Sequence, residues 1–132
     1  MGTLNVLEAA RKNGAKRFIF ASSIYVYSKK GAFYRTSKRA CEQLIDDYNS
    51  EFGLNYTILR FGSLYGPRAD STNTVYQLVA QALTSKSMTY RGTGEEVREY
   101  IHALDGASSA VEILKPEYKN QIMHLTGNER IT

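Results

Sequence analysis

A tyrosine and a lysine four residues apart are the clearest candidates for acid–base chemistry in this sequence of 132 residues. Tyr34 and Lys38 have the spacing that puts two side chains on one face of a helix. A nearby ammonium stabilises a phenolate and lowers the pKa of a phenol below its usual value of about 10. Such a pair can act as a general base or acid near neutral pH. The pair alone is also common on helix surfaces, so its surroundings decide its meaning.

The segments around this pair predict helices that alternate with buried strands. Helical spacing of apolar residues predicts helices over residues 3–13, 33–52, 73–85 and 104–114, with Ser71 or Thr72 capping the third. Short apolar runs predict a strand over residues 17–21, buried on both faces, and a second buried strand over 55–60. A last strand is predicted over 121–125, with a further short strand at 88–90 and a loop at 63–67. The order predicts a single α/β domain over residues 1–132 with a parallel sheet flanked by helices.

Four blocks carry a resemblance to a known family. They are residues 21–27 (ASSIYVY), 34–38 (YRTSK), 59–68 (LRFGSLYGPR) and 97–105 (VREYIHALD). In this order they resemble the extended short-chain dehydrogenase/reductases, in the NAD-dependent epimerase/dehydratase family that acts on nucleotide-linked sugars. The resemblance covers nearly the whole chain. It implies a partial Rossmann-like parallel sheet, incomplete on its N-terminal side.

The resemblance implies a catalytic role for three residues. Tyr34 matches the tyrosine that moves a proton while hydride passes to or from a nicotinamide. Lys38 matches the lysine that holds the nicotinamide ribose, and Ser23 the serine that bonds the substrate oxygen. Ser22, the residue before Ser23, is expected to contact the cofactor. An equally simple interpretation is a hydroxyl at the strand end that hydrogen-bonds the backbone.

The resemblance also implies contacts from two later segments. Phe61 and Gly62 match a strand end that passes the nicotinamide, and Ser63 follows where the sugar diphosphate lies. Arg98 matches an arginine that grips the diphosphate, which a guanidinium can do through paired hydrogen bonds. Without the motif, Arg98 would be interpreted as a solvated charge among glutamates. His124 is expected to be a strand histidine, and no Cys/His cluster suggests a metal site.

The sequence departs from the family pattern in two ways that bear on function. The Gly-rich turn that holds a dinucleotide pyrophosphate is missing, so we expect a central fragment that binds NAD or NADP poorly. Only six residues, 28–33, separate Tyr27 from Tyr34, where relatives have a longer loop. We therefore expect an epimerase/dehydratase-like protein that is inactive as an isolated chain. The alternative is a non-catalytic relative that serves only as a dimerisation module.

Composition limits the other partners. The net charge is +4, with 11 Lys/Arg against 6 Asp/Glu up to residue 70 and 6 against 7 beyond it. No dense basic run suggests nucleic-acid binding, and no apolar run is long enough for a membrane span. The single cysteine fits a reducing cytoplasm, which is the expected location. The family resemblance implies a nucleotide-sugar substrate and a homodimer formed through the helices at 3–13 and 33–52.

Overall fold

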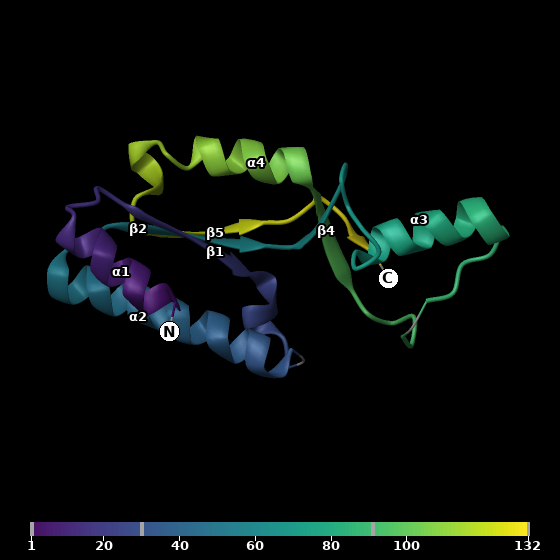
Figure 1. Ribbon diagram of the computed structural model, residues 1–132, viewed down its shortest axis with the longest axis horizontal. Helices are drawn as coiled ribbons and strands as arrows, with labels where there is room; N and C mark the ends of the chain where they lie inside the picture. Colours follow the sequence, from purple (N-terminus) through teal and green to yellow (C-terminus); the bar gives the residue numbers. More distant parts are fainter. Residues whose placement is uncertain (1, 30, 91, 132) are drawn as a thin grey trace.

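The larger part of the molecule is a three-layer unit, called the body here. The computed structural model describes residues 2–29, 31–90 and 92–131. A parallel sheet has the order β1 (Phe18–Ser23), β2 (Tyr56–Phe61) and β5 (Gln121–Leu125). Helices α1 (Gly2–Lys12) and α2 (Ala32–Phe52) cover one face, and α4 (Ala103–Glu112) lies over the other (Figure 1). The predicted α/β class with a parallel sheet is confirmed.

A smaller unit, called the lobe, extends from one end of the body. It contains helix α3 (Thr74–Ser85) and the strands β3 (Ser63–Tyr65), β4 (Arg98–His102) and β6 (Arg130–Ile131). Strand β4 runs parallel to β3 and antiparallel to β6 (Figure 1). Two short 3-10 helices, η1 (Ile24–Tyr27) and η2 (Pro116–Tyr118), complete the elements.

Three local predictions were wrong in the lobe, including the segment that leads into it from β2. Residues 63–65, expected as loop, form β3 because β4 passes alongside and pairs Ser63 with Tyr100. Residues 88–90 form no strand, and β4 itself was not predicted. The cap of α3 is Asn73 and not Ser71 or Thr72, since the Asn73 side chain accepts the Tyr76 N–H at 3.1 Å.

The core lies between the α1–α2 layer and the sheet. Its fully or nearly buried members come from α1, α2 and β2 and from the turn before β2: Leu7, Ile45, Leu54, Tyr56 and Ile58. Burying each such side chain stabilises the fold by about 1.5–3 kcal/mol. Helix α2 ends at Gly53, whose φ of +67° lets its N–H return to the Asn49 and Tyr48 carbonyls.

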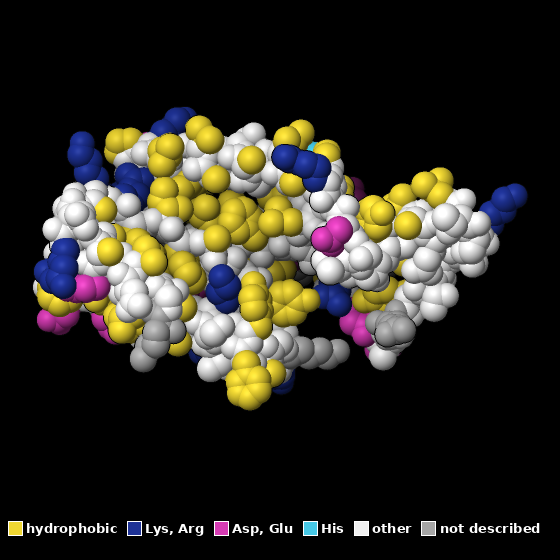
Figure 2. Space-filling view, in the orientation of Figure 1, with side chains coloured by type: hydrophobic (Ala, Val, Ile, Leu, Met, Phe, Trp, Pro, Cys, Tyr) yellow, Lys and Arg dark blue, Asp and Glu magenta, His cyan; other side chains and the backbone are white. Residues whose placement is uncertain are grey.

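One face of strand β1 is more exposed than predicted. Ile19 is 39% exposed and the strand alternates between half-buried and exposed positions up to Ser22. The expectation of burial on both faces was wrong, because Ile19 and Ala21 on one face of this edge strand are exposed, whereas Phe18 and Phe20 on the other face pack against the core. Hydrophobic side chains gather on this side of the molecule, between α4 and the α2 layer (Figure 2).

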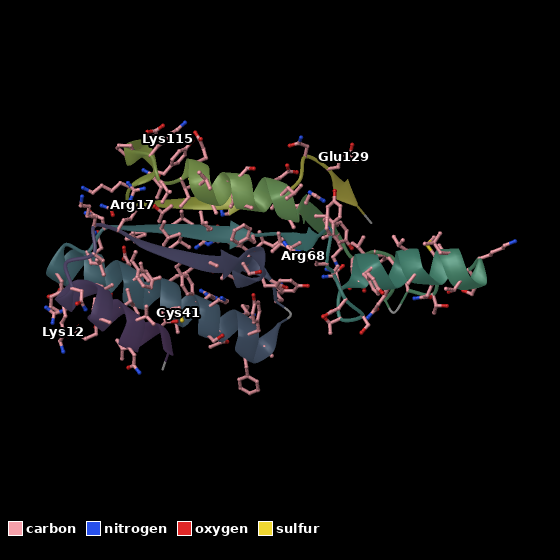
Figure 3. The ribbon with its side chains drawn as sticks, turned by 45° about the horizontal axis from the view of Figure 1, so that its top comes forward. Lys12, Arg17, Cys41, Arg68, Lys115 and Glu129 are labelled. Carbon is pink, nitrogen blue, oxygen red and sulfur yellow. The ribbon has the colours of Figure 1, made fainter. Side chains whose placement is uncertain are left out.

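The far end of the body is tied together by Arg17. Its Nη1 donates to the Ile113 carbonyl at 2.7 Å and to the Lys115 carbonyl at 3.1 Å, so it joins the start of β1 to the end of α4. Arg17 and Lys115 lie at the same end of the molecule in Figure 3. Among the described residues, no helix has the length and apolar character needed to cross a membrane.

Candidate active site

The carboxyl end of β1 turns directly into η1, and Ser23 makes this turn. Ser23 is 7% exposed, and its hydroxyl accepts the Tyr25 N–H at 3.3 Å, which caps η1. The same hydroxyl donates to the Phe61 carbonyl on β2 at 3.4 Å. Two strand ends therefore meet at Ser23, as expected for a site at the carboxyl edge of a parallel sheet.

Tyr34 and Lys38 lie one turn apart at the start of α2, beside this strand end. The Tyr34 side chain is 51% exposed, and its ring meets Tyr25 edge-to-face with the centroids 6.3 Å apart. The Lys38 ammonium is 5.8 Å from the Tyr34 ring centroid. It donates to the Ala21 carbonyl at 2.8 Å, so it is anchored to β1. The short connection therefore places Tyr34 close to η1, which Ser23 caps.

Arg98 reaches this group from the lobe. Its Nη1 donates to the Tyr25 hydroxyl, although the two residues are 73 positions apart. The pKa of Arg98 is raised, first by a hydrogen bond with Tyr90 and, against the effect of burial, also by Tyr25. Among the described residues, the hydroxyls of Tyr25 and Tyr90 hold the guanidinium beside this group.

The segment after β2 connects the site to the lobe. At Gly62 an added Cβ would lie 2.5 Å from the Glu99 carbonyl oxygen, so the glycine allows β4 to pass against β2. Phe61 lies under α4, where a Cβ at Gly106 would be 3.4 Å from its ring. Ser63 begins β3 and pairs with Tyr100. These positions have a structural role in the junction.

A pocket of about 1030 Å³ lies in the lobe beside Arg98. Its walls are mainly apolar and come from α3, from β4 and from the segments before β4 and after β5; they include Val75, Leu78, Val79, Ala82, Leu83, Met88, Tyr90, Tyr100 and Glu129. Arg68 lies between the body and α3 (Figure 3). A concave apolar pocket with few polar groups is the usual form of a small-molecule site.

Ser22 belongs to a separate polar network that the sequence analysis missed. Its hydroxyl donates to Glu42 Oε1 at 2.5 Å, and Arg60 binds Glu42 through Nε at 3.0 Å and Nη2 at 2.6 Å. Burial raises the pKa of Glu42, but the hydrogen bonds from Arg60 and Ser22 lower it more. Its members lie 18 to 20 residues apart, a spacing with no local signal.

His124 completes this network on β5. Its Nε2 lies 2.9 Å from the Tyr27 hydroxyl and 3.4 Å from Arg60 Nη1. His124 is therefore a strand histidine that hydrogen-bonds other side chains. No cluster of three or more His, Cys, Asp or Glu residues that suits a metal ion occurs in the part of the chain that the structure describes.

The chain belongs to the NAD-dependent epimerase/dehydratase family, whose family model matches residues 1–124. It is 30% identical to the uncharacterized UDP-glucose epimerase YtcB of Bacillus subtilis, over 95% of this chain and 44% of that protein.

Two solved structures have the same fold. The UDP-glucose 4-epimerase of Thermotoga maritima with UDP-glucose has a TM-score of 0.87 and 26% identity, over 99% of this chain and 48% of that one. The UDP-glucuronic acid 4-epimerase of Bacillus cereus with NAD has a TM-score of 0.86 and 28% identity, over 98% and 47%.

The chain spans less than half the length of these relatives. The match with the Bacillus subtilis protein extends over 138 positions, more than the 132 residues of this chain. The matched region therefore includes positions of the Bacillus subtilis protein that this chain lacks.

Proposed function

We propose that Tyr34, Lys38 and Ser23 form the acid–base site of an NAD-dependent oxidoreduction at a sugar carbon of a nucleotide sugar. The observation that supports this most is a single network of contacts. It runs from Lys38 and Tyr34 through Tyr25 to Ser23 on one side and to Arg98 on the other. The proton-transfer group and the anion-binding group are thereby joined beside a large pocket.

Each residue of the body has a role in this proposal. Tyr34, half exposed, takes the proton from a sugar hydroxyl, and Ser23 hydrogen-bonds the same oxygen. Lys38, anchored to the Ala21 carbonyl, places its positive charge beside the Tyr34 ring. When bound, NAD or NADP supplies the acceptor for the hydride.

The residues present suit only one end of that cofactor. The exposed Tyr34 and the anchored ammonium of Lys38 suit a nicotinamide ribose at the carboxyl end of β1. Phe61 and Gly62 lie at the neighbouring end of β2, where the resemblance predicts a nicotinamide contact. The 132 residues contain no Gly-rich turn for the pyrophosphate, so we propose that the isolated chain does not turn over.

The lobe is proposed to bind the nucleotide. Arg98, which the Tyr25 hydroxyl holds at the edge of the pocket, grips the diphosphate through its guanidinium, and Ser63 contacts the sugar side. The apolar walls formed by α3 suit the planar face of a base.

Calorimetric titration tests this proposal. We expect the folded chain to bind UDP-glucose saturably and NAD at least tenfold more weakly. The Arg98→Met variant should weaken UDP-glucose binding about tenfold, since it removes a charge-assisted hydrogen-bond donor. Arg39→Met, which removes an exposed charge on α2, is the matched control and should bind like the wild type. An absence of heat with UDP-glucose at millimolar concentration would refute the proposal.

A second candidate function is a dimerisation module without turnover. The helices α1 and α2 lie side by side and expose large apolar side chains: Val6 is 56%, Phe33 91% and Phe52 56% exposed. A second copy of the chain that packs against these helices would cover such side chains. Light scattering should give twice the chain mass, and Phe33→Ser should lower the dimer fraction. A monomer well above micromolar concentration would exclude this candidate.

A further inference from the structure

Tyr25 lies between the two halves of the proposed site. It is a half-buried residue of η1, two positions after Ser23. Its backbone N–H donates to the Ser23 hydroxyl at 3.3 Å, and its carbonyl accepts the Ser28 N–H at 3.0 Å. The backbone of Tyr25 is therefore fixed on both sides, and the direction in which its side chain leaves η1 is defined.

The ring of Tyr25 packs against the start of α2. It meets the Tyr34 ring at 83°, with 6.3 Å between the centroids, which is a favourable edge-to-face arrangement. A Cβ at Gly31 would lie 3.4 Å from Cδ1 of the same ring. Gly31 also has a φ of +98°, which suits glycine. The short connection thus brings its backbone against Tyr25 and places Tyr34 beside it.

The hydroxyl of Tyr25 contacts the lobe. It accepts a hydrogen bond from Arg98 on β4, in the lobe. Arg98 borders the large pocket together with Tyr90. One side chain therefore touches both the proposed proton-transfer residue and the proposed diphosphate-binding residue.

We infer that Tyr25 is a positioning residue for a nucleoside diphosphate: its hydroxyl orients the Arg98 guanidinium toward the diphosphate while its ring locates Tyr34. This inference rests on the proposed function. It predicts that the Tyr25 hydroxyl contributes to binding of the diphosphate and not of the nucleoside. A purely structural role would change both affinities alike.

The test compares UDP with uridine in calorimetric titrations of the full 132-residue chain. Tyr25→Phe removes the hydroxyl and keeps the ring. We expect the dissociation constant of UDP to rise about tenfold, as for loss of a hydrogen bond to a charged group, and that of uridine to stay unchanged. Tyr27→Phe is the matched control, because the Tyr27 hydroxyl accepts from a different arginine, Arg60, within the body. It should leave both constants unchanged.

A double-mutant cycle tests whether the Tyr25 hydroxyl acts on UDP binding through Arg98. Arg98→Met should weaken UDP binding at least as much as Tyr25→Phe, and the double variant should be no weaker than Arg98→Met alone. Tyr25→His, which keeps a ring and an acceptor, should give an intermediate affinity. If circular dichroism shows that Tyr25→Phe does not fold, Tyr25→His replaces it in the comparison of UDP with uridine.

The outcomes separate this inference from the proposed function. If wild type and Arg98→Met differ for UDP but Tyr25→Phe equals wild type, the role of Tyr25 is wrong and the proposed function stands. Additive effects of the two substitutions, or equal weakening of UDP and uridine, also overturn it. If the folded wild type binds no UDP, both the proposed function and the inference fail.

Discussion

The body and the lobe differ in how they are held together. In the body, Leu7, Ile45 and Ile58 are at most 1% exposed, and α1, α2 and β2 enclose them. In the lobe, α3 has no buried residue, and its apolar Val79 and Leu83 are 53% and 80% exposed. The body therefore has its own core, whereas the apolar side of α3 faces an open pocket.

This difference fits the tasks proposed for the two regions. A residue that transfers a proton needs a rigid support, and Tyr34, Lys38 and Ser23 all rest on the body. A region that admits a ligand needs apolar surface left uncovered, and the lobe has it. Regions with few buried contacts are also those of lowest local stability, so the lobe should open more easily than the body.

The largest expected effect is in the core of the body. Ile58→Ala should lower the free energy of unfolding by about 3 kcal/mol, because it leaves a cavity in a closed core. Leu83→Ala, the control in the lobe, should change it by less than about 0.5 kcal/mol. Urea unfolding followed by circular dichroism measures both. If Leu83→Ala lowered the free energy of unfolding by a similar amount, the apolar face of α3 would be covered in solution. The difference between the body and the lobe would then not hold.

The next effect concerns the ion pair of Glu42 and Arg60, whose side chains are 11% and 14% exposed. Glu42→Gln leaves the Arg60 charge uncompensated and should destabilise the chain by about 3 kcal/mol. Glu112→Gln is the control: its pair with Lys115 is 49% and 54% exposed, so the change should be below about 1 kcal/mol.

The same pair predicts a pH dependence. Burial raises the pKa of Glu42, but the hydrogen bonds from Arg60 and Ser22 outweigh this effect and bring the pKa below its ordinary 4.5. A carboxyl with a lowered pKa in the folded state contributes stability above pH 4.5, which is lost as the pH falls through the folded pKa. Wild-type stability should therefore fall below pH 4.5, and the Glu42→Gln curve should be flatter. Parallel curves would contradict the assignment.

A smaller effect is expected at the junction of the two regions. A methyl group at Gly62 would meet the Glu99 carbonyl oxygen at 2.5 Å, and backbone cannot move away as a side chain can. Gly62→Ala should destabilise the chain by about 2 kcal/mol and speed amide exchange in β4. Gly2→Ala, where no atom lies within 4 Å, should be neutral or slightly stabilising. Unchanged amide exchange in β4 would show that the backbone at the junction moves to make room for the methyl group.

The smallest effect is at the N-terminus of α3. Asn73→Ala removes the cap on Tyr76 and the bond from Asn73 Nδ2 to the Leu64 carbonyl, at 2.8 Å. It should cost about 1 kcal/mol, whereas Thr72→Ala should cost less. Guanidinium unfolding of both variants decides between the observed cap and the one expected from sequence.

Much of the body could be predicted from sequence because its signals are local. Apolar periodicity located α1 and α2 within one or two residues, and the apolar run at 121–125 gave β5 with its observed bounds. The lobe was harder. Strand β4 has mixed polarity and pairs with partners more than 30 residues away, so no local pattern distinguishes it from a loop.

The sequence alone determined the family, the pair of Tyr34 and Lys38, and the serine at a strand end, because order and spacing along the chain carry that information. Only the tertiary structure showed that Ser22 bonds Glu42, that Gly62 makes room for β4, and that Tyr25 connects Tyr34 with Arg98. These contacts join residues far apart in sequence. They depend on how the sheet and α2 pack, which no local pattern contains.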